Sequence, residues 1–166
     1  ILKAPKREPA LGRGGTQVVL DLSNPKVQDF VFGVVDNLMT KYPEIDYIKW
    51  DANAPVMNHG SQYLPMADQS HLYIEYHRGL EKVCQRIRAK YPTLTIQACA
   101  SGGGRNDIES LRRSVPFMRS DADRTTTALR LSMSSTFNRW IPFHGSATKE
   151  SNFVIVNSLR KFAALA

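Results

Sequence analysis

The chain has 166 residues, of which 42% are apolar and 22% charged, so a disordered chain is excluded and a packed domain, or a piece of one, is expected. No apolar run approaches the ~18 residues that cross a bilayer, which argues against a membrane protein. The net charge of +7 comes from scattered lysines and arginines with few interleaved aromatic residues, which argues against a nucleic-acid-binding protein. The chain opens on Ile1 without an initiator methionine, which predicts a piece of a longer protein.

The first half of the chain alternates strand and helix patterns. Residues 16–22 are a β-branched run typical of a buried strand, and Asn24-Pro25 then supplies a capping side chain and a proline for a first helical turn. This helix is expected to end at Tyr42-Pro43, and its apolar face is expected to carry Val27, Phe30, Val31, Val34, Val35 and Leu38. A second strand over 46–50, a loop over 51–69 and a helix near 70–90 follow. The apolar residues of this second helix are Leu72, Tyr76, Leu80, Val83 and Ile87.

The second half repeats this alternation. The expected elements are a third strand over 94–98, a turn over 101–104, a short helix over 107–113, a weak fourth strand over 115–118, a helix over 124–138, a strand over 141–143 and a helix over 150–166. Strands that alternate with single helices indicate a parallel α/β fold. Four to five such units fit either an open doubly wound sheet or part of a (β/α)₈ barrel, which typically needs ~250 residues. The pattern of strands and helices alone does not decide between the open sheet and the barrel.

Polar clusters follow three of the expected strands, at the ends where parallel α/β sheets bind ligands. They are residues 49–53, residues 99–105 with Asp107, and residues 119–124. Asp51 and one of Asp121 or Asp123 can flank a single bond. Glycoside hydrolysis uses such a pair, in which one carboxylate stays ionised to attack and the other stays protonated to donate. Each of these carboxylates can instead cap a helix or lie in a surface turn.

Other chemistries fit the residues less well. The glycine-rich segment 101–105 lacks the spacings of nucleotide-binding loops, although a phosphate-binding loop stays open. His71 and His77 are six residues apart and no Cys or His pair has zinc spacing, so we expect no metal and no other cofactor. Cys99 has no convincing histidine partner for nucleophilic catalysis, which favours a small buried residue.

Three ordered motifs resemble the catalytic region of glycoside hydrolase family 36 α-galactosidases. Residues 47–53 are similar to the family's KWDxN segment, residues 99–105 with Asp107 to CSGGGGRxD, and Ser120-Asp121 to WxSDxTD. Residues 19–25 also resemble the family's VLDLSNP turn, and the resemblance covers about residues 10–147. The chain departs from the pattern at several positions: Ala54 replaces a common arginine, Ala100-Ser101 replaces Ser-Gly, Met118 replaces the tryptophan, and Asp123-Arg124 replaces Thr-Asp.

The resemblance implies a fold and a reaction. Family members have a (β/α)₈ barrel between an N-terminal β-sandwich and a smaller C-terminal β domain, so residues 1–166 would be a middle slice of the barrel without an internal boundary. They are retaining enzymes that release terminal α-galactose from raffinose- or melibiose-type galactosides. Carried over by position, Asp51 is the nucleophile and Asp121 the general acid/base. The implied contacts to the galactose ring are Lys49, Asn53, Cys99 and Gly102, with Arg13 as a weaker candidate.

The departures leave substrate preference open. An α-N-acetylgalactosaminide, a pentopyranoside or transfer of α-galactose to another sugar remain alternatives, as does a non-catalytic carbohydrate- or phosphate-binding α/β domain. Asp121 is favoured over Asp123 as the proton donor because Arg119 and Arg124 would hold Asp123 ionised. The expected partner is an oligosaccharide substrate, with no nucleic acid and no membrane, while compartment and homo-oligomeric state are left open.

Overall fold

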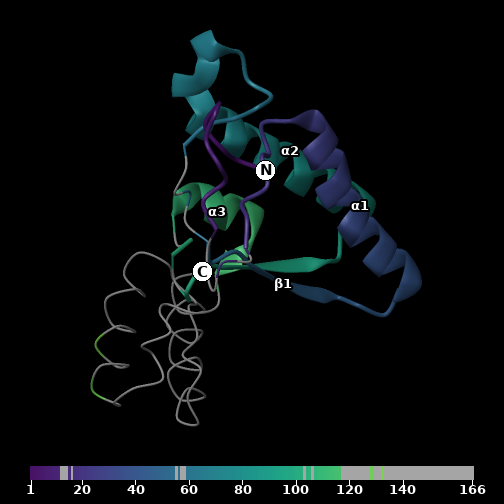
Figure 1. Ribbon diagram of the computed structural model, residues 1–166. Helices are drawn as coiled ribbons and strands as arrows, with labels where there is room; N and C mark the ends of the chain where they lie inside the picture. The colour runs from purple at the N-terminus through teal and green to yellow at the C-terminus, as the bar shows by residue number, and fades with distance from the viewer. Residues whose placement is uncertain are drawn as a thin grey trace. The chain divides into compact units, whose positions relative to one another are not determined.

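The computed structural model describes residues 1–11, 15, 17–54, 56, 59–102, 104–105 and 107–116, together with Ala128 and Ser132. Its elements in chain order are α1 (Pro25–Lys41), β1 (Tyr47–Asp51), the 3-10 helix η1 (Met66–His71), α2 (Leu72–Lys90), β2 (Thr95–Cys99), α3 (Ile108–Arg113) and β3 (Val115–Pro116). Figure 1 labels α1, α2, α3 and β1. They form two compact units, one of residues 1–47 and 54–94, the other of residues 48–53 and the described residues from Thr95 onward. Of the elements expected over 124–138, 141–143 and 150–166, only Ala128 and Ser132 are described, and both are helical; the rest of these three segments lies outside the described residues.

Helix α1 begins and ends where its sequence predicts. The Asn24 side chain accepts a hydrogen bond from the Lys26 N–H at 3.0 Å, Pro25 occupies the first turn, and the Tyr42 N–H closes the last turn on the Leu38 carbonyl at 2.9 Å. The predicted buried face is wrong in part. Gln28, Val35 and Met39 are buried, whereas Phe30 is 61% exposed and Val34 53% exposed. The helix is apolar around more than one side, and its packing partner α2 covers only one of them.

Helix α2 confirms its predicted apolar face, with Leu72, Val83 and Ile87 buried and Tyr76 and Leu80 partly buried. It packs against α1, and polar groups at its carboxyl end join the two helices. The Lys90 ammonium lies 2.5 Å from the Asp36 carboxylate, which also accepts a bond from the Tyr91 hydroxyl at 2.6 Å. These bonds, that of Lys90 first, lower the pKa of Asp36, and the same carboxylate raises the pKa of Lys90.

The strand expected over 16–22 is wrong for the residues that the structure describes. Gln17 makes an isolated bridge, and residues 18–22 are irregular. A β-branched run becomes a strand when neighbouring strands bond its backbone, but here the backbone bonds go elsewhere. The Val19 carbonyl accepts from the Leu2 N–H at 2.8 Å, and the Leu22 carbonyl accepts from the Gln28 side chain at 2.8 Å.

The described strands form a sheet in the order β1-β2-β3. Strands β2 and β3 are parallel, with Gln97 opposite Val115 and Ala98 opposite Pro116. The last four residues of β2 are all buried, as expected for a strand with neighbours on both sides. The parallel α/β prediction is therefore confirmed for this part of the chain.

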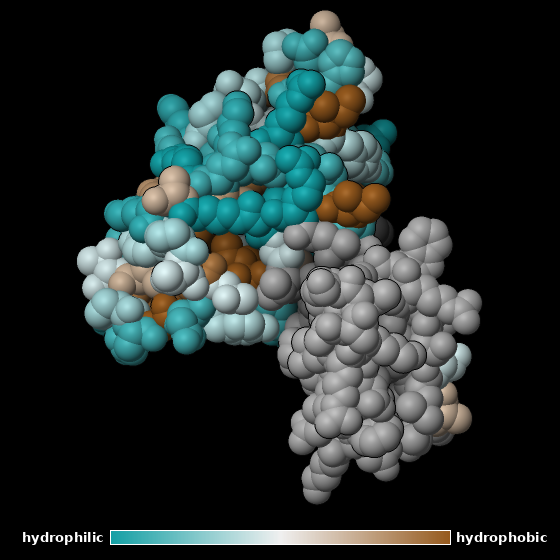
Figure 2. Space-filling model, turned by 180° about the vertical axis from the view of Figure 1, so that it is seen from behind, coloured by the Kyte–Doolittle hydropathy of each residue, from teal (hydrophilic) through white to brown (hydrophobic). Residues whose placement is uncertain are grey.

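Some apolar side chains of the first unit reach the surface. Brown residues interrupt the mostly teal described surface in Figure 2, and Phe30, Val34 and Leu38 of α1 are among the exposed apolar residues of the chain. Because they are four residues apart, they form one stripe along the helix. No helix among the described residues is long and apolar enough to cross a membrane.

Candidate active site

The carboxyl ends of β1 and β2 lie side by side in the second unit. The N–H of Ala52, the first residue after β1, donates to the carbonyl of Cys99, the last residue of β2, at 2.9 Å. Ligands of parallel α/β sheets bind at such ends. Two of the three polar clusters found in the sequence therefore meet at one edge of the sheet, as predicted.

Strand β1 places Lys49 and Asp51 on one of its faces. Both are exposed, and they alternate with Ile48 and Trp50, which are partly buried. Because side chains alternate along a strand, the ammonium and the carboxylate share a side. Asp51 is the last residue of the strand, where a ligand at the sheet edge can reach its carboxylate.

Asn53 connects this strand end to the glycine-rich turn. Its side-chain oxygen Oδ1 accepts a hydrogen bond from the Ser101 N–H at 2.6 Å. Ser101 and Gly102 both have left-handed backbone conformations, with φ values of 47° and 82°. The Gly104 N–H then closes the turn on the Ala100 carbonyl at 3.0 Å, so the turn predicted over 101–104 is confirmed.

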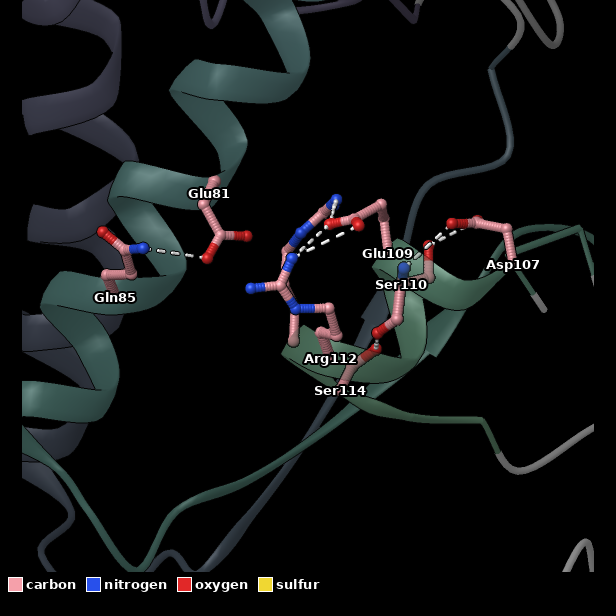
Figure 3. Close-up of polar contacts among 8 residues, drawn as sticks. Glu81, Gln85, Asp107, Glu109, Ser110, Arg112 and Ser114 are labelled. Carbon is pink, nitrogen blue, oxygen red and sulfur yellow. Dashed lines mark hydrogen bonds and ion pairs between the residues drawn. The ribbon is translucent and has the colours of Figure 1, made fainter. Parts of the chain in front are cut away.

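Asp107 caps the short helix α3 that follows this turn. Its carboxylate accepts from the Ser110 N–H at 2.9 Å and from the Ser110 hydroxyl at 2.7 Å, as Figure 3 shows. Burial raises the pKa of Asp107, but the bonds from Ser110 outweigh it and leave the pKa below its ordinary value. The stabilisation of the folded state by the ionised Asp107 is therefore fully present above the ordinary carboxyl pKa. It is lost as the pH falls through the lower pKa that Asp107 has in the folded state. The structure therefore assigns Asp107 a structural role as the N-cap of α3.

Of the remaining predicted site residues, the structure describes Gly102 and Cys99. Gly102 is buried within the turn, and Cys99 is a free cysteine with 3% exposure, which fits the small buried residue expected of it. Their contacts with a galactose ring remain predictions. Asp121, Asp123 and Arg13 lie outside the described residues, so the pairing of Asp51 with Asp121 also remains a prediction.

A buried hydrogen-bond network in the first unit was not found from the sequence. The Asp21 carboxylate, 3% exposed, accepts from the Ser23 hydroxyl and the Ser61 hydroxyl, each at 2.5 Å. Gln69 in turn bonds both backbone groups of Ser61, at 2.9 and 2.8 Å. The network anchors the segment that contains Ser61. An aspartate inside an apolar run was its only sequence signal, since Ser61 is 40 residues away.

Comparison with known proteins then identifies the family. The Melibiase family model matches residues 1–144. The chain belongs to the Melibiase family. Within the part of the chain that the structure describes, no three His, Cys, Asp or Glu side chains gather as metal ligands.

Several proteins similar to this chain are α-galactosidases. It is 40% identical to α-galactosidase 2 of Pediococcus pentosaceus over 95 residues, which are 57% of this chain and 13% of that protein. The crystal structure of the α-galactosidase from Lactobacillus brevis matches with a TM-score of 0.75 and 32% identity, over 85% of this chain and 18% of that one. A variant of the GH36 α-galactosidase AgaA from Geobacillus stearothermophilus, in complex with raffinose, matches with a TM-score of 0.74 and 29% identity, over 86% and 19%. The resemblance to family 36 is confirmed, and the chain spans 13 to 14% of the length of such curated relatives.

Proposed function

We propose that this chain is part of the catalytic domain of a retaining α-galactosidase that releases terminal α-galactose from raffinose- or melibiose-type oligosaccharides. The observation that carries the proposal is the meeting of the β1 and β2 ends, where an exposed Asp51 and Lys49 lie beside the turn that Asn53 bonds. Membership of the Melibiase family and the raffinose complex of the AgaA variant support the same substrate class.

In the proposed mechanism the two carboxylates act in succession. Asp51 attacks the anomeric carbon and forms a covalent galactosyl ester, while Asp121 gives a proton to the oxygen of the departing sugar. Asp121 then takes a proton from water, which attacks the same carbon and releases galactose with its α configuration retained. Lys49, Asn53 and the turn at Gly102 supply hydrogen-bond donors to the neutral ring hydroxyls, and Cys99 packs against the ring.

We further propose that residues 1–166 form one continuous part of a (β/α)₈ barrel of four to five β/α units. The parallel pairing of β2 with β3 and the β1-β2-β3 order support this architecture. The exposed stripe of Phe30, Val34 and Leu38 also fits it, because the outer helices of a barrel pack against neighbours on both sides.

The full-length enzyme that contains this chain tests the proposal when it is incubated with raffinose and followed by proton NMR. The expected first product is α-galactose, which only later equilibrates with the β anomer, since two successive inversions restore the configuration. Initial release of β-galactose would contradict the retaining mechanism. Binding of galactose without turnover of any α-galactoside would favour the non-catalytic alternative, and transfer of galactose to raffinose would favour a transglycosylase.

Replacement of Asp121 by alanine is expected to slow hydrolysis of raffinose far more than that of an aryl α-galactoside with an acidic phenol. The sugar alcohol needs a proton to leave, whereas the phenolate does not, so we expect a difference of about 10²-fold in the glycosylation rate. Pre-steady-state release of the phenol measures this step for the aryl α-galactoside, and kcat/KM, which reports glycosylation, measures it for raffinose. Asp123→Ala is the matched control, and a leaving-group dependence in that variant instead would assign the proton donor to Asp123.

A further inference from the structure

Ser101 has a backbone conformation that side-chain-bearing residues rarely adopt. Its φ of 47° lies in the left-handed region, where the Cβ atom approaches the backbone and glycine is the usual occupant. The following Gly102, with φ of 82°, meets the same demand without a side chain. A serine in this conformation costs free energy that other interactions must offset.

Asn53 forms a hydrogen bond with the backbone of this serine. Its Oδ1 accepts from the Ser101 N–H at 2.6 Å, across 48 residues of chain and from the neighbouring strand end. The main-chain bond from Ala52 to Cys99 fixes the two strand ends immediately before this contact. The oxygen is used in this way, and the NH₂ group of the same side chain is a donor of the kind that a sugar hydroxyl accepts.

We propose that Asn53 is a positioning residue, which locks Ser101 in the left-handed conformation and thereby sets the backbone of the glycine-rich turn relative to Asp51. The role rests on the proposed α-galactosidase function and adds to it. Asn53 would act on the substrate in two ways. Its NH₂ group would donate a hydrogen bond to the sugar, and its Oδ1 would hold the neighbouring turn in position. A turn that relaxes would move Gly102 away from the sugar, and displacements of about 1 Å are enough to slow catalysis.

The test is a double-mutant cycle in the full-length enzyme. Asn53→Ala removes both the hydrogen bond to the Ser101 N–H and the NH₂ donor. Ser101→Gly lowers the free-energy cost of the left-handed conformation, so that the turn keeps this conformation without that bond. Ser101→Ala is the matched control, because it removes the hydroxyl and keeps the Cβ atom. We measure kcat/KM on raffinose and the thermal midpoint Tm for each single variant and for each Ser101 variant combined with Asn53→Ala.

Ser101→Gly is expected to recover about fivefold of the kcat/KM that Asn53→Ala loses, and part of the lost Tm. Ser101→Ala should recover neither. If the two changes are additive in kcat/KM, the turn is not positioned by Asn53 for catalysis, and the inference is overturned.

The cycle also separates this inference from the proposed function. If the full-length protein hydrolyses no α-galactoside, the function fails, and the Tm cycle still decides whether Asn53 locks the turn. If Asn53→Ala does not fold, Ser101→Gly must raise Tm above that of Ser101→Ala in the otherwise unchanged protein. Equal Tm values there would show that the left-handed serine is not strained, and would overturn the lock.

Discussion

Replacement of Asp51 by glycine in the full-length enzyme is expected to lower kcat on raffinose by on the order of 10⁴-fold while the fold persists. Asp51 is exposed at the end of β1, so its loss leaves no cavity in the core. The covalent intermediate cannot form without this carboxylate, and the reaction loses its first step. Steady-state hydrolysis and a circular dichroism spectrum together measure the effect.

Azide is expected to rescue part of this loss by occupying the space of the missing carboxylate. Because only one displacement then takes place, the product is β-galactosyl azide, of inverted configuration. Asp46→Gly is the matched control, since Asp46 is also exposed and precedes the same strand at its opposite end. Turnover of Asp51→Gly close to that of this control would mean that Asp51 is structural, and the catalytic assignment would fail.

The largest expected loss of stability comes from Gly79→Ala in α2. A Cβ atom at Gly79 would overlap the Leu22 carbonyl oxygen and would lie 2.9 Å from Nε2 of Gln28, which donates to that same oxygen. Backbone atoms cannot rotate out of the way as a flexible side chain does, so α2 or the segment before α1 must move. We expect the free energy of unfolding to fall by about 3 kcal/mol.

Gly33→Ala is the control for this change. Gly33 lies in the interior of α1, and a Cβ atom there would meet nothing within 4 Å. Alanine should therefore stabilise the helix by about 0.5–1 kcal/mol. Urea denaturation midpoints of the two variants should move in opposite directions. A Gly79→Ala midpoint equal to that of Gly33→Ala would show that the close approach to Leu22 is not maintained in solution.

Local signals in the sequence predicted where helices α1 and α2 and strands β1 and β2 lie. Asn24-Pro25 and Tyr42-Pro43 predicted both ends of α1, because capping and proline geometry act within one helical turn. The alternation of strands with helices predicted the parallel sheet, and hence that Asp51 and Cys99 end neighbouring strands. The ordered motifs also predicted the family, since they depend on residue type and spacing alone.

Tertiary structure alone decided which groups meet. The face that α1 buries depends on where α2 packs, and residues 17–22 form no continuous strand because their backbone bonds go to Leu2 and Gln28. The bond from Ser101 to Asn53 joins positions 48 residues apart, and no local pattern encodes such a pairing. Periodicity and capping are properties of neighbouring residues, whereas burial and long-range hydrogen bonds exist only once distant segments have packed together.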